Sequence, residues 1–111
     1  MLSSNLNLTV MASNKRVYII AKVTGLSQLE VSMKYQNAKV LVQSFGYEPV
    51  SPVDYVPLNT DWHSAMRICI PLLLNCDAYI VVDALHTTPG GLIEDTIAGW
   101  VGLPRIYLSK L

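Results

Sequence analysis

The chain has 111 residues, of which 51% are hydrophobic, and its eight basic and eight acidic residues give a formal net charge of zero. This length and composition suit a single domain with its own hydrophobic core. The balanced charge, without a stripe of Lys and Arg, argues against polynucleotide binding. The apolar runs are far shorter than the roughly 20 residues of a membrane span. We therefore expect neither a polynucleotide nor a membrane as partner.

The ends of the chain and its cysteines indicate a cytoplasmic protein. Residues 1–15 lack the basic start and the apolar core of a secretory signal, so we predict a disordered extension there and one domain over 16–111. Cys69 and Cys76 are predicted to lie roughly 10 Å apart along one helix, too far for a disulfide, and free thiols suit the reducing cytosol. Two cysteines and two histidines match no zinc spacing, and we expect no metal or cofactor.

The first half of the domain shows a strand followed by a helix. Residues 16–21 form a β-branched and aromatic run that is typical of a buried strand. After a turn at 24–27, Ser27 and Glu30 have the spacing of a capping box, which predicts a helix start. Gly46 supplies the left-handed residue that ends this helix. Its apolar residues recur at helical spacing: Leu29, Met33, Ala38, Leu41, Val42 and Phe45.

The second half continues the alternation of strands and helices. The predicted segments are strand 47–50, loop 51–60, helix 62–74, strand 78–83, loop 84–90, helix 92–101 and strand 106–108. Asp61 is a candidate cap for the second helix, and Pro71 is expected to kink that helix or delay its start. Gly102 closes the third helix.

This β-α-β-α-β-α-β order predicts an α/β fold. Connections of 20 to 30 residues that contain helices imply parallel strands with right-handed crossovers. We predict a single doubly wound, Rossmann/flavodoxin-like sheet of four parallel strands in the order 2-1-3-4, with helices on both faces. Ligands of such sheets bind outside the carboxyl ends of the strands where the order reverses. The loops at 22–27 and 84–91 should therefore line the crevice.

Residues 86–94 carry the strongest functional pattern. Gly90 and Gly91 allow close approach of the backbone to a ligand, and the predicted helix start that follows offers free amides. Glu94 is expected in the first turn of this helix, where the dipole favours the carboxylate. A carboxylate beside a sugar can attack the anomeric carbon. The ordinary alternative is that Glu94 only complements the helix dipole.

Other polar residues in these loops are candidate ligand contacts. Asp83, His86 and Thr88 follow the third strand, where they could instead cap the strand end, face solvent or satisfy loop amides. Trp62 and Trp100 are expected to be core or interface residues.

Three segments resemble the small domains related to the nucleoside 2-deoxyribosyltransferases: RVYIIAKVTGL, WHSAMRICIPLLLNCDAYIVV and TTPGGLIEDTIAGWVGLPRIYL, together spanning about residues 16–108. The shared pattern is a "CDA" segment, a pair of small residues and a helix with "E…A…LG.P". The matching residues here are Cys76-Asp77-Ala78, Gly90-Gly91, Glu94, Ala98 and Gly102-Leu103-Pro104.

The resemblance implies roles for two residues and an oligomeric state. Glu94 corresponds to the catalytic nucleophile of that family, and Tyr18 resembles its substrate-contacting tyrosine. The relatives complete their pockets at a subunit interface. The second helix, with Met66, Ile70, Leu73 and Leu74, would also leave apolar surface exposed on a small sheet. We therefore predict a homodimer or higher homo-oligomer.

The sequence departs from the family pattern at two positions. Cys69 stands where the relatives carry an aspartate that holds and protonates the substrate, and a thiol serves poorly in both tasks. Lys22 stands where the relatives often have glycine or proline. Together with Thr24 and Gly25, Lys22 could bind a 5′-phosphate, or it could be a solvated loop charge.

Two functional hypotheses follow. In the first, the domain cleaves or transfers the N-glycosidic bond of a nucleoside or nucleoside monophosphate through Glu94. In the second, it is a non-catalytic nucleotide-binding module, and Cys69 in place of the family's aspartate indicates that catalytic activity has been lost. A receiver-type signalling domain would need acidic residues after the first strand, where this chain has Ala21 and Lys22.

Overall fold

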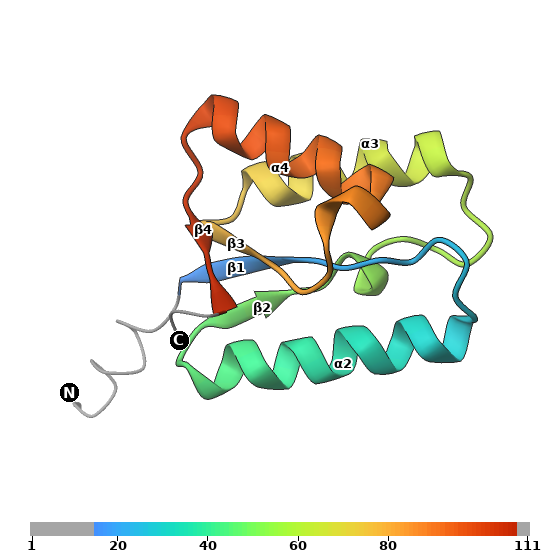
Figure 1. The fold of residues 1–111 in the computed structure, drawn as a ribbon, viewed down its shortest axis with the longest axis horizontal. Coiled ribbons are helices and arrows are strands. Elements are labelled where there is room, and N and C mark those ends of the chain that lie inside the picture. Colours follow the sequence, from blue (N-terminus) through green and yellow to red (C-terminus); the bar gives the residue numbers. More distant parts are fainter. Residues whose placement is uncertain (1–14, 109–111) are drawn as a thin grey trace.

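The computed structural model describes residues 15–108, in which a parallel sheet lies between two layers of helices (Figure 1). The predicted extension over residues 1–15 falls almost wholly outside this range. The strands are β1 (Arg16–Ile20), β2 (Glu48–Val50), β3 (Ala78–Val81) and β4 (Arg105–Ile106). The helices are α2 (Gln28–Ser44), α3 (Trp62–Leu74) and α4 (Pro89–Val101), with short 3-10 turns at η1 (Pro52–Asp54) and η2 (Leu85–Thr87).

The predicted strand order is confirmed. All neighbouring strands pair in parallel in the order β2-β1-β3-β4, and the register places Tyr18 beside Val50 on one side and Tyr79 on the other. Helix α2 covers one face of the sheet, and α3 and α4 cover the other (Figure 1). The fold is therefore doubly wound and Rossmann-like, and its order reverses between β1 and β3.

Alternation along β1 divides the core between the two faces of the sheet. Val17 and Ile19 pack with Tyr35 of α2, whereas Tyr18 and Ile20 join the cluster under α3 and α4. Strand β1 is almost completely buried because helices cover both faces. This burial places the Tyr18 side chain on the same face as α3 and α4.

The local signals at the helix ends are confirmed. The Ser27 side chain accepts from the Glu30 amide at 3.1 Å, and the Glu30 carboxylate accepts from the Ser27 amide at 2.9 Å. The Asp61 carboxylate accepts from the Ser64 amide at 2.9 Å. Gly46 and Gly102 adopt φ angles of 85° and 77°, which only glycine adopts without strain.

The helix boundaries and faces differ in part from prediction. Helix α3 runs from Trp62 to Leu74 without a break, because Pro71 lies in its last turn on the exposed side, where solvent can bond the carbonyl it leaves free. Helix α4 begins at Pro89 rather than at 92, since proline suits the first helical position. Strands β3 and β4 are shorter than predicted.

Several predicted core residues lie on the surface. Leu29, Met33 and Phe45 of the first helical segment are exposed, and Tyr35, Ala38 and Val42 are the buried residues of α2. Trp100 is 87% exposed, so it is not a core residue.

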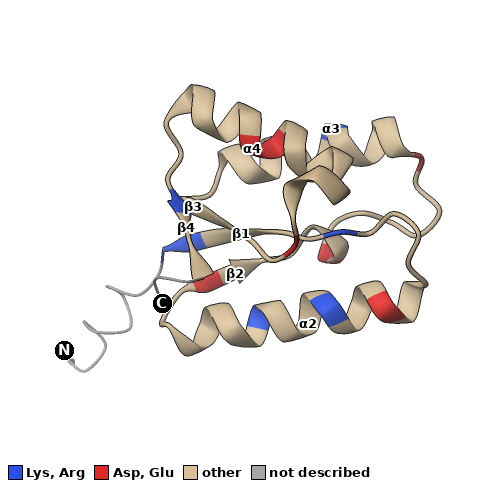
Figure 2. Ribbon diagram, viewed as in Figure 1, with Lys and Arg blue, Asp and Glu red and all other residues tan. Residues whose placement is uncertain are grey.

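Within residues 15–108, no helix is both long and apolar enough to cross a membrane. Figure 2 shows Lys and Arg spread over several elements of the described chain, without a stripe along any one of them.

Candidate functional site

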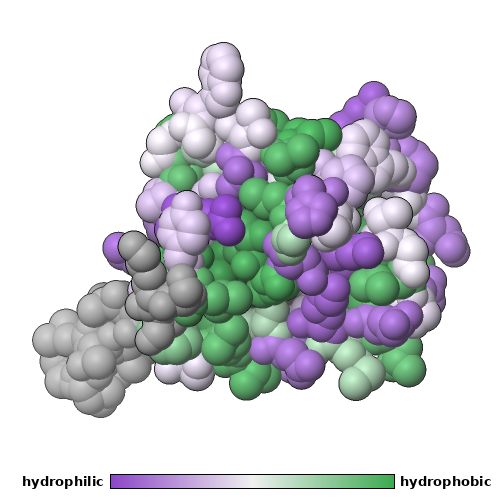
Figure 3. All heavy atoms as spheres, in the orientation of Figure 1, coloured by the Kyte–Doolittle hydropathy of each residue, from purple (hydrophilic) through white to green (hydrophobic). Residues whose placement is uncertain are grey.

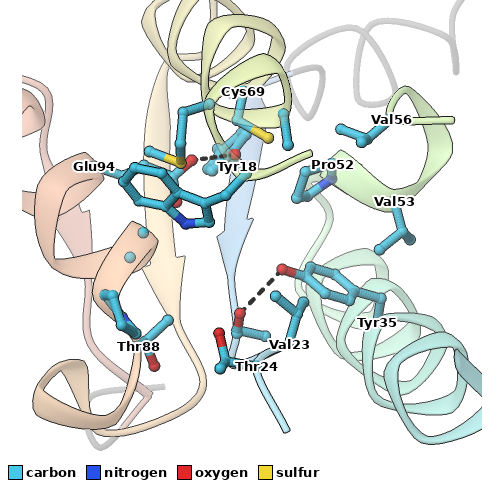
Figure 4. Close-up of a pocket in the computed structure, with 17 residues that line it drawn as sticks. Tyr18, Val23, Thr24, Tyr35, Pro52, Val53, Val56, Cys69, Thr88 and Glu94 are labelled. Atoms are coloured by element: carbon cyan, nitrogen blue, oxygen red, sulfur yellow. Dashed lines mark hydrogen bonds between the residues drawn. The ribbon is translucent and has the colours of Figure 1, made fainter. Parts of the chain in front are cut away.

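A pocket of about 160 Å³ opens at the carboxyl end of β1, beside the point where the strand order reverses. Figure 4 shows Glu94, Tyr18 and Cys69 on one side of it, and Tyr35, Pro52 and Val53 on the other. The polar and aromatic residues that line it are Tyr18, Thr24, Tyr35, Trp62, Cys69, Thr88 and Glu94. The remaining wall is largely apolar and comes from the segment after β1, the predicted loop 51–60, α3 and the start of α4.

Glu94 is a buried carboxylic acid at the wall of this pocket. Its side chain accepts a hydrogen bond from the Tyr18 hydroxyl, and the residue is 6% exposed. Burial raises the pKa of Glu94 to about 7, and the hydrogen bond from Tyr18 lowers it in part. The expectation of a first-turn carboxylate favoured by the helix dipole is wrong: α4 begins at Pro89, so Glu94 lies in the second turn and desolvation dominates.

Two adjacent tyrosines fix α4 on the sheet. Tyr18 and Tyr79 are register partners on β1 and β3 and bond consecutive residues of α4. Tyr18 donates to Glu94, and Tyr79 donates to Asp95 at 2.5 Å. Arg105 lies 3.7 Å from the same Asp95 oxygen. These contacts hold the Glu94 carboxylate at a defined rotation of the helix.

Gly91 permits the close contact between α4 and β1. A Cβ atom at this position would lie 2.6 Å from Ile20 Cγ2 and 2.6 Å from Thr88 Cγ2. At Gly90 a Cβ would meet the Met66 sulfur at 3.2 Å, a tighter contact than usual. The glycine pair therefore sets how closely the start of α4 approaches the sheet and α3.

The structure brings seven of the residues predicted for the site to one pocket: Tyr18, Thr24, Cys69, Thr88, Gly90, Gly91 and Glu94. Four predicted residues do not line it: Lys22, Gly25, Asp83 and His86. His86 lies exposed in η2, and Gly25 forms a turn with φ of 80°.

Asp83 has a structural role at the ends of β1 and β3. Its carboxylate accepts from the Lys22 amide at 2.6 Å and from Lys34 Nζ at 2.9 Å. Burial alone would raise its pKa, but these bonds hold the pKa of Asp83 below its ordinary value. No Lys, Arg or His among residues 15–108 lines the pocket, so Lys22 lies outside it, and the phosphate site at Lys22 stays a prediction.

Sequence reasoning missed the aromatic residue on α2 and assigned Trp62 no ligand contact. The Tyr35 hydroxyl donates to the Ala21 carbonyl at 3.2 Å and its ring faces the pocket (Figure 4). The spacing of Val31, Tyr35, Ala38 and Val42 is helical and would have revealed this buried face. Trp62 is half-exposed at the start of α3, with its indole nitrogen 3.7 Å from a Cβ built at Gly90.

The donor groups within the described range do not suit a metal. No group of three or more His, Cys, Asp or Glu residues between 15 and 108 is placed to hold an ion. Cys69 and Cys76 are both free, and burial raises the pKa of each thiol above its ordinary value. Glu94 is the only Asp or Glu side chain among the described residues that line this pocket.

Comparison with known proteins gives a family for this fold and pocket. The sequence model described as Domain of unknown function (DUF4406) matches residues 15–107. The chain belongs to the DUF4406 family. The matched span includes every element of the sheet and every residue that lines the pocket, so the Glu94 site lies within the DUF4406 domain. A search of curated proteins gave no match to the chain.

Replacing Tyr18 with Phe should raise the pKa of Glu94 further. The change removes the hydrogen bond that lowers this pKa and leaves the buried ring in place, so we expect a rise of about one pH unit. Carboxyl-selective NMR titration of Glu94 measures it. Tyr35→Phe is the matched control, because that hydroxyl bonds a backbone carbonyl and not Glu94. An unchanged Glu94 titration in Tyr18→Phe would contradict the assigned hydrogen bond.

Proposed function

We propose that the DUF4406 domain cleaves or transfers the N-glycosidic bond of a nucleoside or nucleoside monophosphate, with Glu94 as the nucleophile. The observation that carries this proposal is the Glu94 carboxyl group, buried and held by Tyr18 at the wall of a pocket beside the strand-order reversal. The resemblance of the sequence to the nucleoside 2-deoxyribosyltransferases supports the same chemistry.

The walls of the pocket suit a ligand with a flat ring and a sugar. Trp62, Tyr35 and apolar residues such as Pro52 and Val56 offer surfaces for a heterocycle, and few polar groups interrupt them. At about 160 Å³ the pocket is smaller than the roughly 300 Å³ at the lower end of ligand pockets. A nucleoside would therefore extend to the pocket mouth.

The proposed reaction uses the Glu94 carboxylate as the nucleophile and the neutral Tyr18 hydroxyl to orient it. An ionised Glu94 oxygen attacks the anomeric carbon while the bond to the base breaks and its electron pair leaves with the base. Tyr18 stays neutral, because burial and the nearby Glu94 raise the pKa of its hydroxyl, and it orients the carboxylate. Water or a second base then displaces the glycosyl ester and restores Glu94.

Base release is the test of this proposal. The protein would be incubated with purine and pyrimidine nucleosides and with their monophosphates, and free base would be measured by chromatography. A 2-fluoro-sugar analogue should form a lasting adduct that mass spectrometry places on Glu94. Failure to release base from any substrate, together with no adduct, would reject the enzymatic function.

Cys69 favours a second candidate function, a non-catalytic nucleotide-binding module. It lines the pocket at the position where the sequence resemblance expects an aspartate. Burial raises the pKa of its thiol, so it does not supply a proton at neutral pH. Ligand binding without base release would select this alternative.

The proposal includes a homodimer. Trp100 and Leu74 are 87% and 45% exposed near the ends of α4 and α3, although Leu73 is fully buried. Figure 3 shows further hydrophobic residues across the middle of one face, bordered by hydrophilic ones. Sedimentation velocity at micromolar concentration should give a dimer, and Trp100→Glu should weaken it by burying a charge at the interface. A monomer at all concentrations would contradict this prediction.

A further inference from the structure

The pocket holds one acidic group and no basic group. Glu94 is the only Asp or Glu among the lining residues of the described chain, and no Lys, Arg or His accompanies it. The surrounding wall is largely apolar, so an ionised Glu94 carries a negative charge that nothing in residues 15–108 neutralises at the pocket. A positively charged ligand would supply the missing counter-charge.

Among residues 15–108, no His and no second carboxyl group lines the pocket to protonate the leaving base. Burial raises the pKa of the Tyr18, Tyr35 and Cys69 side chains above their ordinary values, so each is a weaker proton donor than the free side chain. Glu94 cannot attack as a carboxylate and donate a proton in the same step. An ordinary neutral base departs as an anion unless it is protonated, whereas a cationic base departs neutral.

We propose that this site takes N-glycosides whose base carries a fixed positive charge, such as pyridinium nucleosides; this substrate class rests on the function proposed above. The fixed positive charge of the base would both neutralise the Glu94 carboxylate and remove the need for a proton donor to the leaving base. The rings of Trp62 and Tyr35 add surfaces that attract a cation, and the small pocket suits a base of one ring.

Water is the only co-reactant of the proposed cleavage. A Glu94 oxygen forms a bond to the anomeric carbon, and the glycosidic bond breaks with its electron pair moving to the ring nitrogen. The base departs as a neutral pyridine without receiving a proton. Water then attacks the anomeric carbon, the ester bond breaks to restore the carboxylate, and one proton passes to solvent.

Binding of two isosteric rings tests the ligand class without any glycosidic bond. Calorimetry at pH 8 would compare 1-methylnicotinamide, a fixed cation, with the neutral 3-methylbenzamide. The cation should bind at least about tenfold more tightly to the wild-type protein, and Glu94→Gln should remove the preference. Equal binding of the two rings to the wild-type protein would overturn the proposal.

The wild-type protein also provides a pH test that needs no variant. Because burial raises the pKa of Glu94 to about 7, the ionised fraction increases between pH 6 and pH 8, and affinity for the cation should increase by up to about tenfold. The other titratable groups that face Glu94, which are Tyr18 on β1, Tyr35 on α2 and Cys69 on α3, stay neutral over this range. Affinity that does not change with pH would overturn the proposal.

A cleavage assay separates this inference from the proposed function. Nicotinamide riboside should release nicotinamide, while its reduced and uncharged form and ordinary neutral nucleosides should react at least about a hundredfold more slowly. Base release from neutral nucleosides but not from nicotinamide riboside would leave the function and overturn the substrate class. A preference for the cation in binding, with no base release from any nucleoside, would reject the function and support the ligand class.

Discussion

Replacing Glu94 with Gln is expected to stabilise the fold at pH 8 while reducing base release by roughly a thousandfold or more. The amide keeps an oxygen that accepts from Tyr18 but has no anionic oxygen to form a glycosyl ester. It also removes the cost of ionising a buried group. The variant should therefore be more stable than the wild-type protein at pH 8 but release base more slowly.

The size of the stability gain follows from the titration of Glu94. Its pKa is raised from the ordinary value of 4.5 to about 7, so between these values the native state binds the proton more tightly than the unfolded chain. The free energy of unfolding should fall as pH rises from about 4.5 to about 7 and level off above it, by up to about 3 kcal/mol in total. Glu94→Gln should lose this pH dependence.

Urea unfolding at pH 5 and pH 8 measures the stability gain of the variant at pH 8 and the pH dependence of the free energy of unfolding. Glu48→Gln is the matched control, since Glu48 is exposed and lies 3.8 Å from Arg16, and its change should stay within about 0.5 kcal/mol. If Glu94→Gln were less stable than the wild-type protein at pH 8, the carboxylate would have a partner that the structure does not contain among residues 15–108.

Gly91→Ala is expected to destabilise the protein by about 2 kcal/mol or more. The added methyl group would lie 2.6 Å from Ile20 and 2.6 Å from Thr88, and both of these side chains are β-branched and buried. Neither can rotate away easily, so α4 must move off β1. That shift would also separate Glu94 from Tyr18, and the titration of Glu94 should change with the loss of stability.

Gly99→Ala is a matched control in the same helix. A Cβ at Gly99 meets nothing within 4 Å, and alanine favours the helix over glycine, so this variant should gain about 0.4 to 1 kcal/mol. Chemical denaturation of the two variants should therefore give changes of opposite sign. Equal and small effects would show that α4 adapts to the extra methyl group at Gly91.

Much of the fold could be predicted because its signals are local. The capping box at Ser27, the cap at Asp61 and the left-handed glycines Gly46 and Gly102 depend on a few neighbouring residues, and the structure contains all of them. The parallel order followed from the spacing of strands and helices. The faces of α2 were harder to predict, because Leu29 and Met33 have helical spacing but lie on the side of the helix away from Tyr35, Ala38 and Val42 and are exposed.

The site could be predicted only in part, because its properties depend on contacts far apart in the sequence. The pattern around Gly90, Gly91 and Glu94 identified one wall of the pocket. The Glu94 pKa depends on burial and on Tyr18, which is 76 residues away, so helix position alone gave the wrong sign. The contact between the Lys22 amide and the Asp83 carboxylate, at 61 residues' separation, is likewise a contact that no local pattern indicates.

The two hydrogen bonds that attach α4 to Tyr18 and Tyr79 affect the entropy cost of ligand binding. Two hydrogen bonds from neighbouring strands to consecutive residues of α4 oppose sliding of the helix along the sheet and rotation about its own axis. The Glu94 carboxyl group is thus oriented when the chain folds, and little conformational entropy of this side chain would remain to be lost on ligand binding. Ligand selection should depend on shape and charge at the mouth of the pocket rather than on closure of a lid.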